Sequence, residues 1–550
     1  MKKSSAKNWI WRVSRADMAR IVLLSVTTGI TSLTTVVFAV LTQRVIDIAL
    51  GDQQGNLWWN IAGLFIVLLF QVAMDVFNSQ FTARILGRME MRIKDTVFAT
   101  LFKKKWQDVS RFHSGELLNR LNSDSHFVAN GVVSLIPRIV SLTTRLVACL
   151  AVLLMLDARF TAVMLALGVV LVAVSRLFGK RVKVLHKQTQ ESDGKARSYM
   201  QESLENWMMI QSFEGSEHVR GRLWDRLKVH FDRSIARNRW SSFSNASIHI
   251  LFSGSYYAAL AWGALRLAAG AISFGTLTAF LQIVSQIRMP FMQMSHVLPQ
   301  YYHMIASAER LIELEDLPDE PRAQQALDCK SVTPQALAIN GVSFAYEPEH
   351  PILTDASLTV RRGEFVALSG FSGIGKTTLF KLMLGFYAPQ SGTLEVATDD
   401  GRYALGADTR GLFAYVPQQS ILLSGTIREN IAFCCPDVTD EQIMAAAKVA
   451  AIDDVIASLP NGLDTPLGER GSGLSEGQLQ RLAIARAVLC DAPILLLDEV
   501  TASLDEATEE TVLRNLRALT DKTCICISHR PAALGVCDRV IRIEDGRFCE

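Results

Sequence analysis

Several features that would assign this 550-residue sequence to other protein classes are scarce or missing. The net charge is only +2, so no basic excess favours binding to nucleic acid. The nine cysteines include no C-x-x-C pair, which argues against a zinc site and favours reduced, buried thiols in a cytosolic domain. We find no internal repeat, no low-complexity tract and no cleavage site typical of a signal peptide. The length itself predicts two or more domains.

Apolar residues, by contrast, are abundant and unevenly distributed. The mean hydropathy is +0.21, which is high for a soluble protein, and the excess lies almost entirely in the first three hundred residues. A membrane-spanning helix needs about 20 mostly apolar residues. By that criterion the sequence predicts six spans, at about 20–43, 57–77, 133–156, 159–178, 246–268 and 276–299.

The positions of basic residues predict how these spans are oriented. Six basic residues precede the first span: Lys2, Lys3, Lys7, Arg12, Arg15 and Arg20. By the positive-inside rule they place the N-terminus in the cytoplasm. The first connection, 51–56, has no Lys or Arg and is expected outside, with Trp58 and Trp59 at the membrane interface. The longer connections 78–132 and 179–245 are rich in Lys and Arg, so we expect cytoplasmic extensions of the helices.

The last part of the chain has the composition of a soluble domain. Residues 317–335 hold three prolines among polar residues, which is typical of a linker. From 336 to 550, β-like apolar runs alternate with helical patterns, as in an α/β domain. The predicted division is therefore a membrane domain over 1–316, a linker over 317–335 and an α/β domain over 336–550 that is expected in the cytoplasm.

A glycine-rich stretch between a predicted strand and a predicted helix carries the strongest motif. Residues 370–378 read Gly-Phe-Ser-Gly-Ile-Gly-Lys-Thr-Thr and fit the phosphate-binding pattern G-x-x-x-x-G-K-[ST]. In that pattern, backbone N–H groups and the positive end of the following helix hold phosphate oxygens. Lys376 would reach the outer phosphates and Thr377 would ligate Mg²⁺. The sequence thus predicts an all-α six-helix transmembrane domain fused to an α/β P-loop nucleotide-binding domain, in one multi-domain membrane protein.

A second motif supports a nucleotide site. Residues 494–497 form an apolar run that ends in Asp498 and Glu499, as in a Walker B strand. At the end of such a strand Asp498 could hold Mg²⁺ through water. Glu499 would then lie where a general base could polarise the attacking water.

With these motifs in place, the sequence resembles the ATP-binding cassette (ABC) family. Leu474-Ser-Glu-Gly-Gln478 is similar to the family's L-S-G-G-Q signature. The other landmarks occur in the family's order: Tyr346, Gln418 in Val-Pro-Gln-Gln, Gly468-Glu-Arg-Gly471, Ser503-Leu-Asp505 and His529 in Ile-Ser-His-Arg. One position departs from the pattern, because Glu476 stands where glycine is commonest. Since Ser475 and Gly477 are present, we interpret Glu476 as a tolerated variation.

The resemblance implies a role for each matched residue. Implied in binding ATP are Tyr346, Gly370, Ser372, Gly373, Gly375, Lys376, Thr377, Thr378, Ser475, Gly477, Gln478 and Asp505. Implied in catalysis are Glu499, His529 and Gln418, and implied in holding Mg²⁺ are Thr377, Gln418 and Asp498. In this family the signature of one cassette covers the ATP held by the P-loop of another, so the resemblance implies a homodimer or a heterodimer with a related chain.

The order of six spans followed by one cassette resembles an exporter-type half-transporter of the bacterial plasma membrane. This implies an ATPase cycle that drives alternating access in contact with membrane lipid. Two cytoplasmic segments, 112–124 and 206–214, are similar to the elements that dock on the cassettes. The expected cargo is an amphipathic or anionic small molecule, lipid or peptide, and no nucleic acid is expected as a partner.

Polar residues within the spans bear on the cargo. Arg138 and Arg145 are seven residues apart, near one face of the third span, and Arg288 lies on the sixth with Gln282 and Gln286. Ionisable groups at membrane depth usually face a cavity or pair with another group. They could therefore form a cationic cargo site, or they could pair between helices or reach the interface, with Asp47 and Asp75 as candidate partners.

Two other functions remain open at this level. The same fold could import, as exporter-like chains do in siderophore uptake, or it could regulate a membrane complex without carrying a solute. A peptidase-containing peptide exporter is disfavoured because no Cys or His precedes the first span.

Overall fold

The computed structural model describes residues 5–322, 328–329, 332–371, 373–419, 422–468 and 473–549. Within these ranges it describes only the backbone at 163–180, 248, 251, 288–289, 291–292 and 294–296. The chain divides into two compact units. One comprises Met1–Ala99 with Ser114–Asp316, and the other comprises Thr100–His113 with Leu317–Glu550.

The first unit is helical. Its long helices are α2 (Met18–Leu50), α3 (Leu57–Leu101), α6 (Ser125–Leu156), α7 (Ala158–Glu205), α9 (Ser216–Ala268) and α10 (Phe274–Glu315), and its short ones are α1 (Ala6–Ser14), α5 (Ser114–Asn119) and α8 (Trp207–Ser212). Among the described residues, three helical stretches are long and apolar enough to span a membrane: Ala6–Leu50, Leu57–Leu101 and Ser114–Leu156. The fourth predicted span falls mostly on 163–178, where side chains are not described, and the fifth and sixth lie in α9 and α10.

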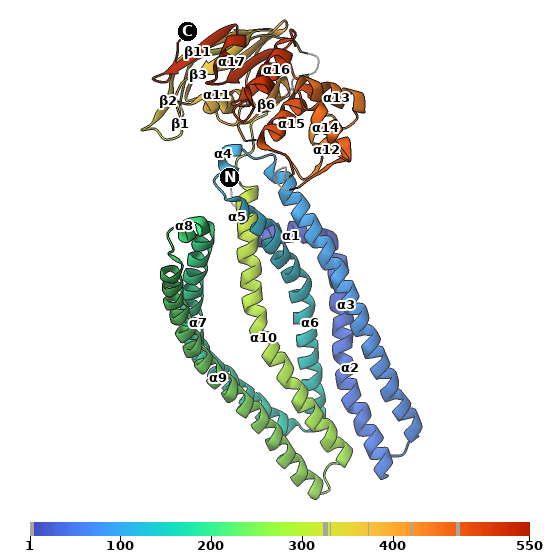
Figure 1. Cartoon of the computed structure of the whole chain (residues 1–550). Coiled ribbons are helices and arrows are strands. Elements are labelled where there is room, and N and C mark those ends of the chain that lie inside the picture. The colour runs from blue at the N-terminus through green and yellow to red at the C-terminus, as the bar shows by residue number, and fades with distance from the viewer. Residues whose placement is uncertain are drawn as a thin grey trace. The chain divides into compact units, whose positions relative to one another are not determined.

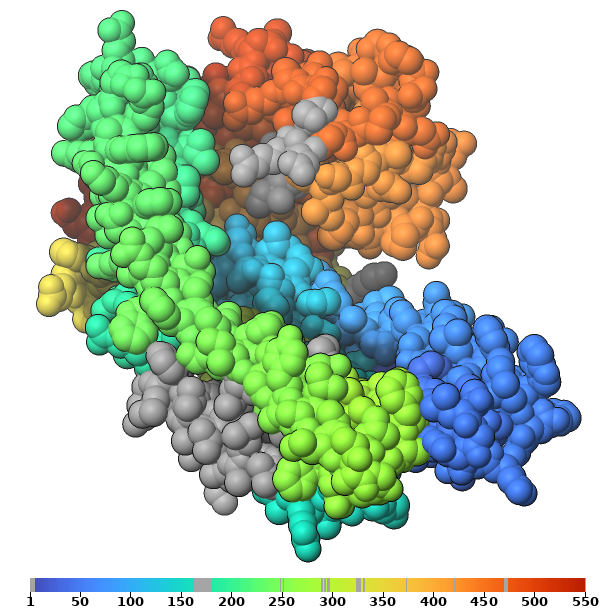
Figure 2. Space-filling model, turned by 90° about the horizontal axis from the view of Figure 1, so that it is seen from below, coloured from blue at the N-terminus to red at the C-terminus, as the bar shows by residue number. Residues whose placement is uncertain are grey.

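Two groups of helices can be distinguished within this unit. Helices α2, α6 and α10 pack against one another, and α7 packs along α9 (Figure 1). Seen from below, the surface of α9 continues into that of α10 (Figure 2), in agreement with their contacts. The turn between α6 and α7 is a single residue, Asp157, whose side chain accepts hydrogen bonds from the N–H groups of Arg159 and Phe160.

Polar contacts also join the helices at membrane depth. The hydroxyls of Ser32 and Ser141 lie 2.5 Å apart between α2 and α6. Thr27 donates to Asn78 Oδ1 over 2.6 Å, which links α2 to α3. Such bonds are favoured in lipid because an unpaired polar group there has no water to bind.

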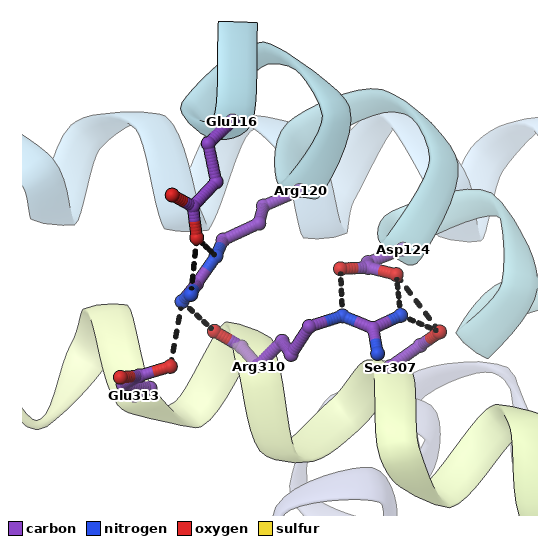
Figure 3. A network of polar contacts seen from close by, with 6 residues as sticks. All are labelled: Glu116, Arg120, Asp124, Ser307, Arg310 and Glu313. Carbon is purple, nitrogen blue, oxygen red and sulfur yellow. Dashed lines mark hydrogen bonds and ion pairs between the residues drawn. The ribbon is translucent and has the colours of Figure 1, made fainter. Parts of the chain in front are cut away.

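A network of charges, of which Arg120 and Asp124 are buried, joins the C-terminal part of α10 to the start of α6 (Figure 3). Residues Arg120–Asp124 form a single π-helical turn, η2, between α5 and α6. Asp124 accepts from Ser307 over 2.9 Å and binds the guanidinium of Arg310 through both carboxylate oxygens. π-Helical turns are rare and widen the helix by one residue. In this chain the turn brings Arg120 and Asp124 onto the same side, facing α10.

The other half of the network belongs to Arg120. Its guanidinium binds Glu116 Oε1 over 2.7 Å, Glu313 Oε2 over 2.9 Å and the Arg310 carbonyl oxygen over 3.0 Å. The side chains of Arg120 and Asp124 are only 8% and 2% exposed, so both charges depend on these partners.

The second unit has an α/β fold built on two sheets. A six-stranded sheet has the order β12-β11-β3-β10-β9-β6, and β3, β6, β9, β10 and β11 run parallel in it. Its strands are β3 (Phe365–Ser369), β6 (Phe413–Val416), β9 (Ile494–Asp498), β10 (Thr523–Ile527), β11 (Arg539–Glu544) and β12 (Arg547–Cys549). Strands β3, β9 and β10 are almost entirely buried, as in parallel sheets covered on both faces. The fold class predicted from the sequence is confirmed.

An antiparallel sheet of order β2-β1-β4-β5 completes this unit. Its strands are β1 (Pro334–Ala345), β2 (Pro351–Arg361), β4 (Ser391–Thr398) and β5 (Gly401–Ala404). Strand β1 begins at Pro334, inside the range predicted as linker. The principal helices are α11 (Lys376–Met383), α12 (Ile427–Ile431), α13 (Asp440–Val449), α14 (Asp453–Ser458), α15 (Glu476–Leu489), α16 (Glu506–Arg517) and α17 (Pro531–Val536).

A segment from the first cytoplasmic connection belongs to this second unit. Residues 100–113 contain the short helix α4 (Trp106–Val109). The N–H of Lys105 donates to the Pro318 carbonyl over 3.0 Å, and the N–H of Glu320 donates to the Lys103 carbonyl over 2.8 Å. Lys104 also pairs with Asp319 over 2.7 Å. The segment is thus bonded, through its backbone, to the chain that leads into the α/β domain.

Candidate nucleotide and transport sites

The glycine-rich loop joins the buried strand β3 to helix α11. Gly373 and Gly375 have φ values of +82° and +109°, which side chains other than glycine rarely adopt. A Cβ at Gly375 would lie 2.3 Å from Ile352 Cγ2, so this position also lacks space for a side chain. The loop ends at the N-terminus of α11, whose free N–H groups favour an anion. Ser372 lies outside the described residues.

Four of the predicted site residues form one connected group. Lys376 Nζ donates to the Gly370 and Phe371 carbonyls, over 2.6 and 3.1 Å, and lies 2.8 Å from His529 Nε2. His529 Nε2 is 3.9 Å from Glu499 Oε1. The other Glu499 oxygen accepts from Gln418 Nε2 over 2.7 Å. Residues separated by more than a hundred positions in sequence therefore meet beside the glycine-rich loop.

The backbone at Glu499 is unusual. Its φ is +50°, in the left-handed region that non-glycine residues seldom occupy, and its N–H is held by the Ile527 carbonyl over 3.0 Å. Such conformations persist where surrounding structure holds them and occur often at functional sites. Here the turn directs the carboxylate away from the end of β9 and toward Gln418.

Asp498 and Thr377 form the predicted Mg²⁺ side of the group. Burial raises the pKa of Asp498, whereas its hydrogen bonds to Thr377 and Tyr415 act in the opposite direction. Burial also lowers the pKa of Lys376, and the negative charges of Glu499 and Asp498 oppose that shift. Tyr415, which the sequence did not single out, donates to Asp498 Oδ2 over 3.3 Å and orients the carboxylate.

Tyr346 lies at the edge of this region with its side chain about half exposed. Its ring centroid is 5.1 Å from that of Phe344 and 5.2 Å from that of Tyr387, both at nearly perpendicular angles. Its hydroxyl is 3.2 Å from Thr378 Oγ1. The ring therefore has two perpendicular aromatic neighbours and stays 46% exposed, so it is accessible for stacking on a base.

The signature residues are organised as a helix N-terminus. Ser475 is the N-cap of α15, and it exchanges two hydrogen bonds with Gln478 in a capping box. A Cβ at Gly477 would lie 2.8 Å from the Ser503 carbonyl oxygen, so glycine is required there by close packing. Glu476 is the first residue of α15, where an acid suits the positive end of the helix. This explains why the departure from the family pattern is compatible with the fold.

The segment that follows the Walker B strand is held by a residue that the sequence analysis did not assign. Arg530 donates to the carbonyls of Ala502 and Leu504, over 3.1 and 2.9 Å, and to Glu509 Oε2 over 2.6 Å. Asp505, the N-cap of α16, accepts from the Thr508 N–H over 3.0 Å, and this hydrogen bond lowers its pKa. The one sequence feature that could have indicated this role is the position of Arg530 directly after His529.

Of the three candidate cargo arginines in the membrane unit, the two whose side chains are described differ in their surroundings. Arg138 is exposed and lies 3.5 Å from Gln300 Oε1. Arg145 is half-buried, and its Nε has no hydrogen-bond partner among the described residues. The side chain of Arg288 lies outside the described residues. Of the candidate acidic partners, Asp47 is buried and accepts from the Gly275 N–H over 3.1 Å, whereas Asp75 is exposed on α3.

Glutamines of α10 lie in the same membrane unit. Gln286 donates to the Thr35 carbonyl over 3.1 Å and lies 3.9 Å from Cys149 Sγ, one helical turn from Arg145. Gln282 Oε1 is buried without a partner among the described residues. Buried polar atoms without partners are uncommon in folded proteins, and they are expected where a ligand or another chain binds.

The nucleotide group was also tested against the chemistry of ATP and Mg²⁺. The hydroxyl of Thr377 and the carboxylate of Asp498 supply the oxygen donors that Mg²⁺ prefers. The Lys376 ammonium and the N-terminus of α11 supply positive charge for phosphates. The donor set therefore fits Mg²⁺ and a triphosphate.

Comparisons with known proteins identify the family. The ABC transporter transmembrane region matches residues 21–291, and the ABC transporter model matches residues 353–502. An ATP-dependent lipid A-core flippase of Chromobacterium violaceum is 31% identical over 503 residues, which cover 91% of this chain and 85% of the relative. A fatty acid ABC transporter ATP-binding/permease protein of Mycobacterium tuberculosis is 29% identical over 438 residues, which cover 79% of this chain and 69% of the relative.

A solved structure agrees with these relatives. The structure of a bacterial Atm1-family ABC exporter with ATP bound matches with a TM-score of 0.78 and 25% identity, over 98% of this chain and 95% of that one. The predicted family, membrane location and ATPase activity coupled to transport are thereby confirmed. This chain belongs to the ABC transporters, as a multi-pass membrane protein that has the exporter fold and binds ATP through a C-terminal ATPase domain.

Proposed function

We propose that two such chains form composite sites in which Mg²⁺ and ATP are held by one P-loop and covered by the other chain's signature. One observation supports this most directly. Lys376, His529, Glu499 and Gln418 are connected to one another, whereas the described side-chain hydrogen bonds of Ser475 and Gln478 are made to each other. Among the described residues, none of these hydrogen bonds joins the catalytic group to the signature within one chain.

Each residue of the group has a definite task under this proposal. Lys376 now donates to two loop carbonyls, and it would turn toward the outer phosphate oxygens. Bound Mg²⁺ would neutralise negative charge on the phosphates. Glu499 would accept a proton from the attacking water, because the hydrogen bond from Gln418 orients its carboxylate. His529, between Lys376 and Glu499, would hold the outer phosphate.

A linked dimer tests whether the sites are composite. Lys376→Ala in one half and Ser475→Ala in the other would leave one composite site intact, whereas both substitutions in the same half would damage both sites. Removing one such transition-state donor costs about 100-fold to 1,000-fold in rate. We expect single-turnover ATP cleavage in the first arrangement and almost none in the second. The opposite ranking would show that each site lies within one chain.

We further propose that the cargo is an anionic amphiphile. The names of the two relatives refer to lipid A core and to fatty acid, which share an acidic head group and acyl chains. In this chain Arg145 is a cation at membrane depth whose Nε has no described partner. A guanidinium in that setting is stabilised by a carboxylate or phosphate.

The cargo proposal predicts a charge-dependent effect of Arg145→Ala. Proteoliposomes containing the full chain would be supplied with a fatty acid anion or with its neutral alcohol. A hydrogen bond to a charged group contributes about 1.5–3 kcal/mol, so the KM for the anion should rise about 10-fold or more while that for the alcohol changes little. Arg288→Ala extends the test to the sixth span, and exposed Arg159→Ala is the control.

The same vesicles separate the remaining alternatives. Accumulation of anion on the side opposite the cassettes supports export, and accumulation on the cassette side supports import. Equal transport of the anion by wild type, Arg145→Ala and Arg288→Ala would exclude the cargo proposal.

A further inference from the structure

Tyr346 is the residue proposed to stack on adenine. The aromatic cluster around it is contacted by the first cytoplasmic connection. Phe344, Tyr346 and Tyr387 form an aromatic triad, with centroid distances of 5.1, 5.2 and 5.6 Å. Phe344 lies near the end of β1, and Tyr346 is the first residue after this strand. Tyr387 comes from the turn after α11, so it braces Tyr346 from a different part of the chain.

Tyr387 is itself braced from outside the cassette sequence. Burial raises the pKa of Tyr387, and a side-chain hydrogen bond with Ser110 acts in the opposite direction. One turn earlier, the ring of Trp106 lies 5.9 Å from that of Phe386. Helix α4, which carries Trp106, therefore covers the pair Phe386–Tyr387.

Phe386 also contacts Arg410. The Arg410 guanidinium lies 4.4 Å from the centre of the Phe386 ring. Arg410 in turn donates to the Leu384 carbonyl over 2.7 Å and pairs with Glu320 over 2.9 Å. Phe386 thus contacts both Trp106 and a guanidinium that is itself held by two hydrogen bonds. The position of α4 is thereby tied to that of the aromatic triad.

We infer that Trp106 and Ser110 are positioning residues for the adenine base of ATP, acting through Phe386 and Tyr387 on Tyr346. The inference rests on the proposed stacking role of Tyr346. A half-exposed ring stacks best when its neighbours hold it in one orientation, and Tyr387 is one of the two aromatic neighbours of Tyr346. Without α4, the side chain of Tyr387 would be more exposed to solvent and more mobile. Tyr346 would then be less preorganised for stacking on adenine.

The test measures base and phosphate recognition separately in the full chain reconstituted in lipid. Aromatic pairs contribute about 0.5–1.5 kcal/mol, so Trp106→Ala should raise the KM for ATP about threefold to tenfold, with kcat at saturation unchanged. Tripolyphosphate has no base, and its inhibition constant as a competitor should not change. Trp106→Phe keeps a ring against Phe386 and should restore most of the affinity. Trp224→Ala, at an exposed tryptophan of α9, is the control.

Tyr387→Leu and Tyr387→Phe extend the same measurement. The leucine variant should resemble Trp106→Ala, and the phenylalanine variant should retain the ring contact with Tyr346 while losing the bond to Ser110. The effect of Ser110→Ala should match that of Tyr387→Phe.

The outcomes separate this inference from the proposed function. If Tyr346→Ala leaves the KM for ATP unchanged, the stacking role of Tyr346 is wrong. If Tyr346→Ala weakens ATP but Trp106→Ala does not, the positioning role alone is overturned. Equal losses for ATP and tripolyphosphate in Trp106→Ala would also overturn it, because the effect would then reach the phosphates.

Discussion

Replacing Glu499 with glutamine should reduce ATP hydrolysis about 100-fold to 10,000-fold, the range ascribed to a general base, while ATP binding persists. Glutamine keeps the shape of the side chain but cannot accept a proton from water. The variant should therefore retain ATP and hold two chains together in the closed state. Steady-state hydrolysis and retention of labelled ATP on the purified chain measure the two effects.

The surroundings of Glu499 should accept glutamine, so this substitution tests proton transfer without a change in packing. The carboxylate is 28% exposed, accepts from Gln418 and lies beside His529, and its backbone is already held at a positive φ. A glutamine can be accommodated there without new contacts. Glu506→Gln, at an acid in the first turn of α16, is a matched control and should hydrolyse ATP normally. Near-normal turnover in Glu499→Gln would remove Glu499 from the role of base.

The substitution Asp124→Ala should cause the largest loss of stability in the membrane unit. Asp124 is almost fully buried, and its carboxylate binds Arg310 and Ser307. The Arg310 side chain that would lose its partner is 44% exposed, so the cost is less than that of breaking a fully buried ion pair and is about 1.5–3 kcal/mol, as for a hydrogen bond to a charged group. The midpoint of thermal unfolding of the detergent-purified chain should fall accordingly.

Two variants distinguish loss of charge from loss of packing at this position. Asp124→Asn keeps the shape and one acceptor oxygen, so it should be less damaging than Asp124→Ala. Glu313→Gln removes a charge that is 56% exposed and should change the midpoint little, because exposed ion pairs contribute about 0–1 kcal/mol. If Asp124→Ala and Glu313→Gln have equal effects, the network does not stabilise the junction of η2 with α10.

The nucleotide residues could be predicted from sequence because each lies in a short motif with a local structural cause. A strand, a glycine-rich turn and a helix N-terminus determine the position of Lys376, and the end of a buried strand determines that of Asp498. The structure brings Gln418, Glu499 and His529 beside them, as the motifs imply. The roles of these residues stay predictions, because their geometry alone does not measure catalysis.

Other features had no local signal. Asp124 and Arg310 are 186 residues apart, and the π-helical turn that brings Asp124 to α10 leaves no mark in the hydrophobic pattern. The contact of Trp106 with Phe386 joins two segments that hydropathy assigns to different domains. Arg530 is the last residue of the Ile-Ser-His-Arg motif, but its bonds to Ala502 and Leu504 depend on the packing of separate loops.

The composition of the second unit has a practical consequence for chimaeric transporters. Its compact body is discontinuous in sequence, since residues 100–113 are bonded to the chain at 318–320 and pack on Phe386. An exchange of cassettes that begins at the linker would transfer Phe386 and Tyr387 to the new protein. It would leave behind Trp106 and Ser110, which contact them. The transferable module therefore consists of two pieces, and a graft that preserves both should keep its own ATP affinity in a foreign membrane domain.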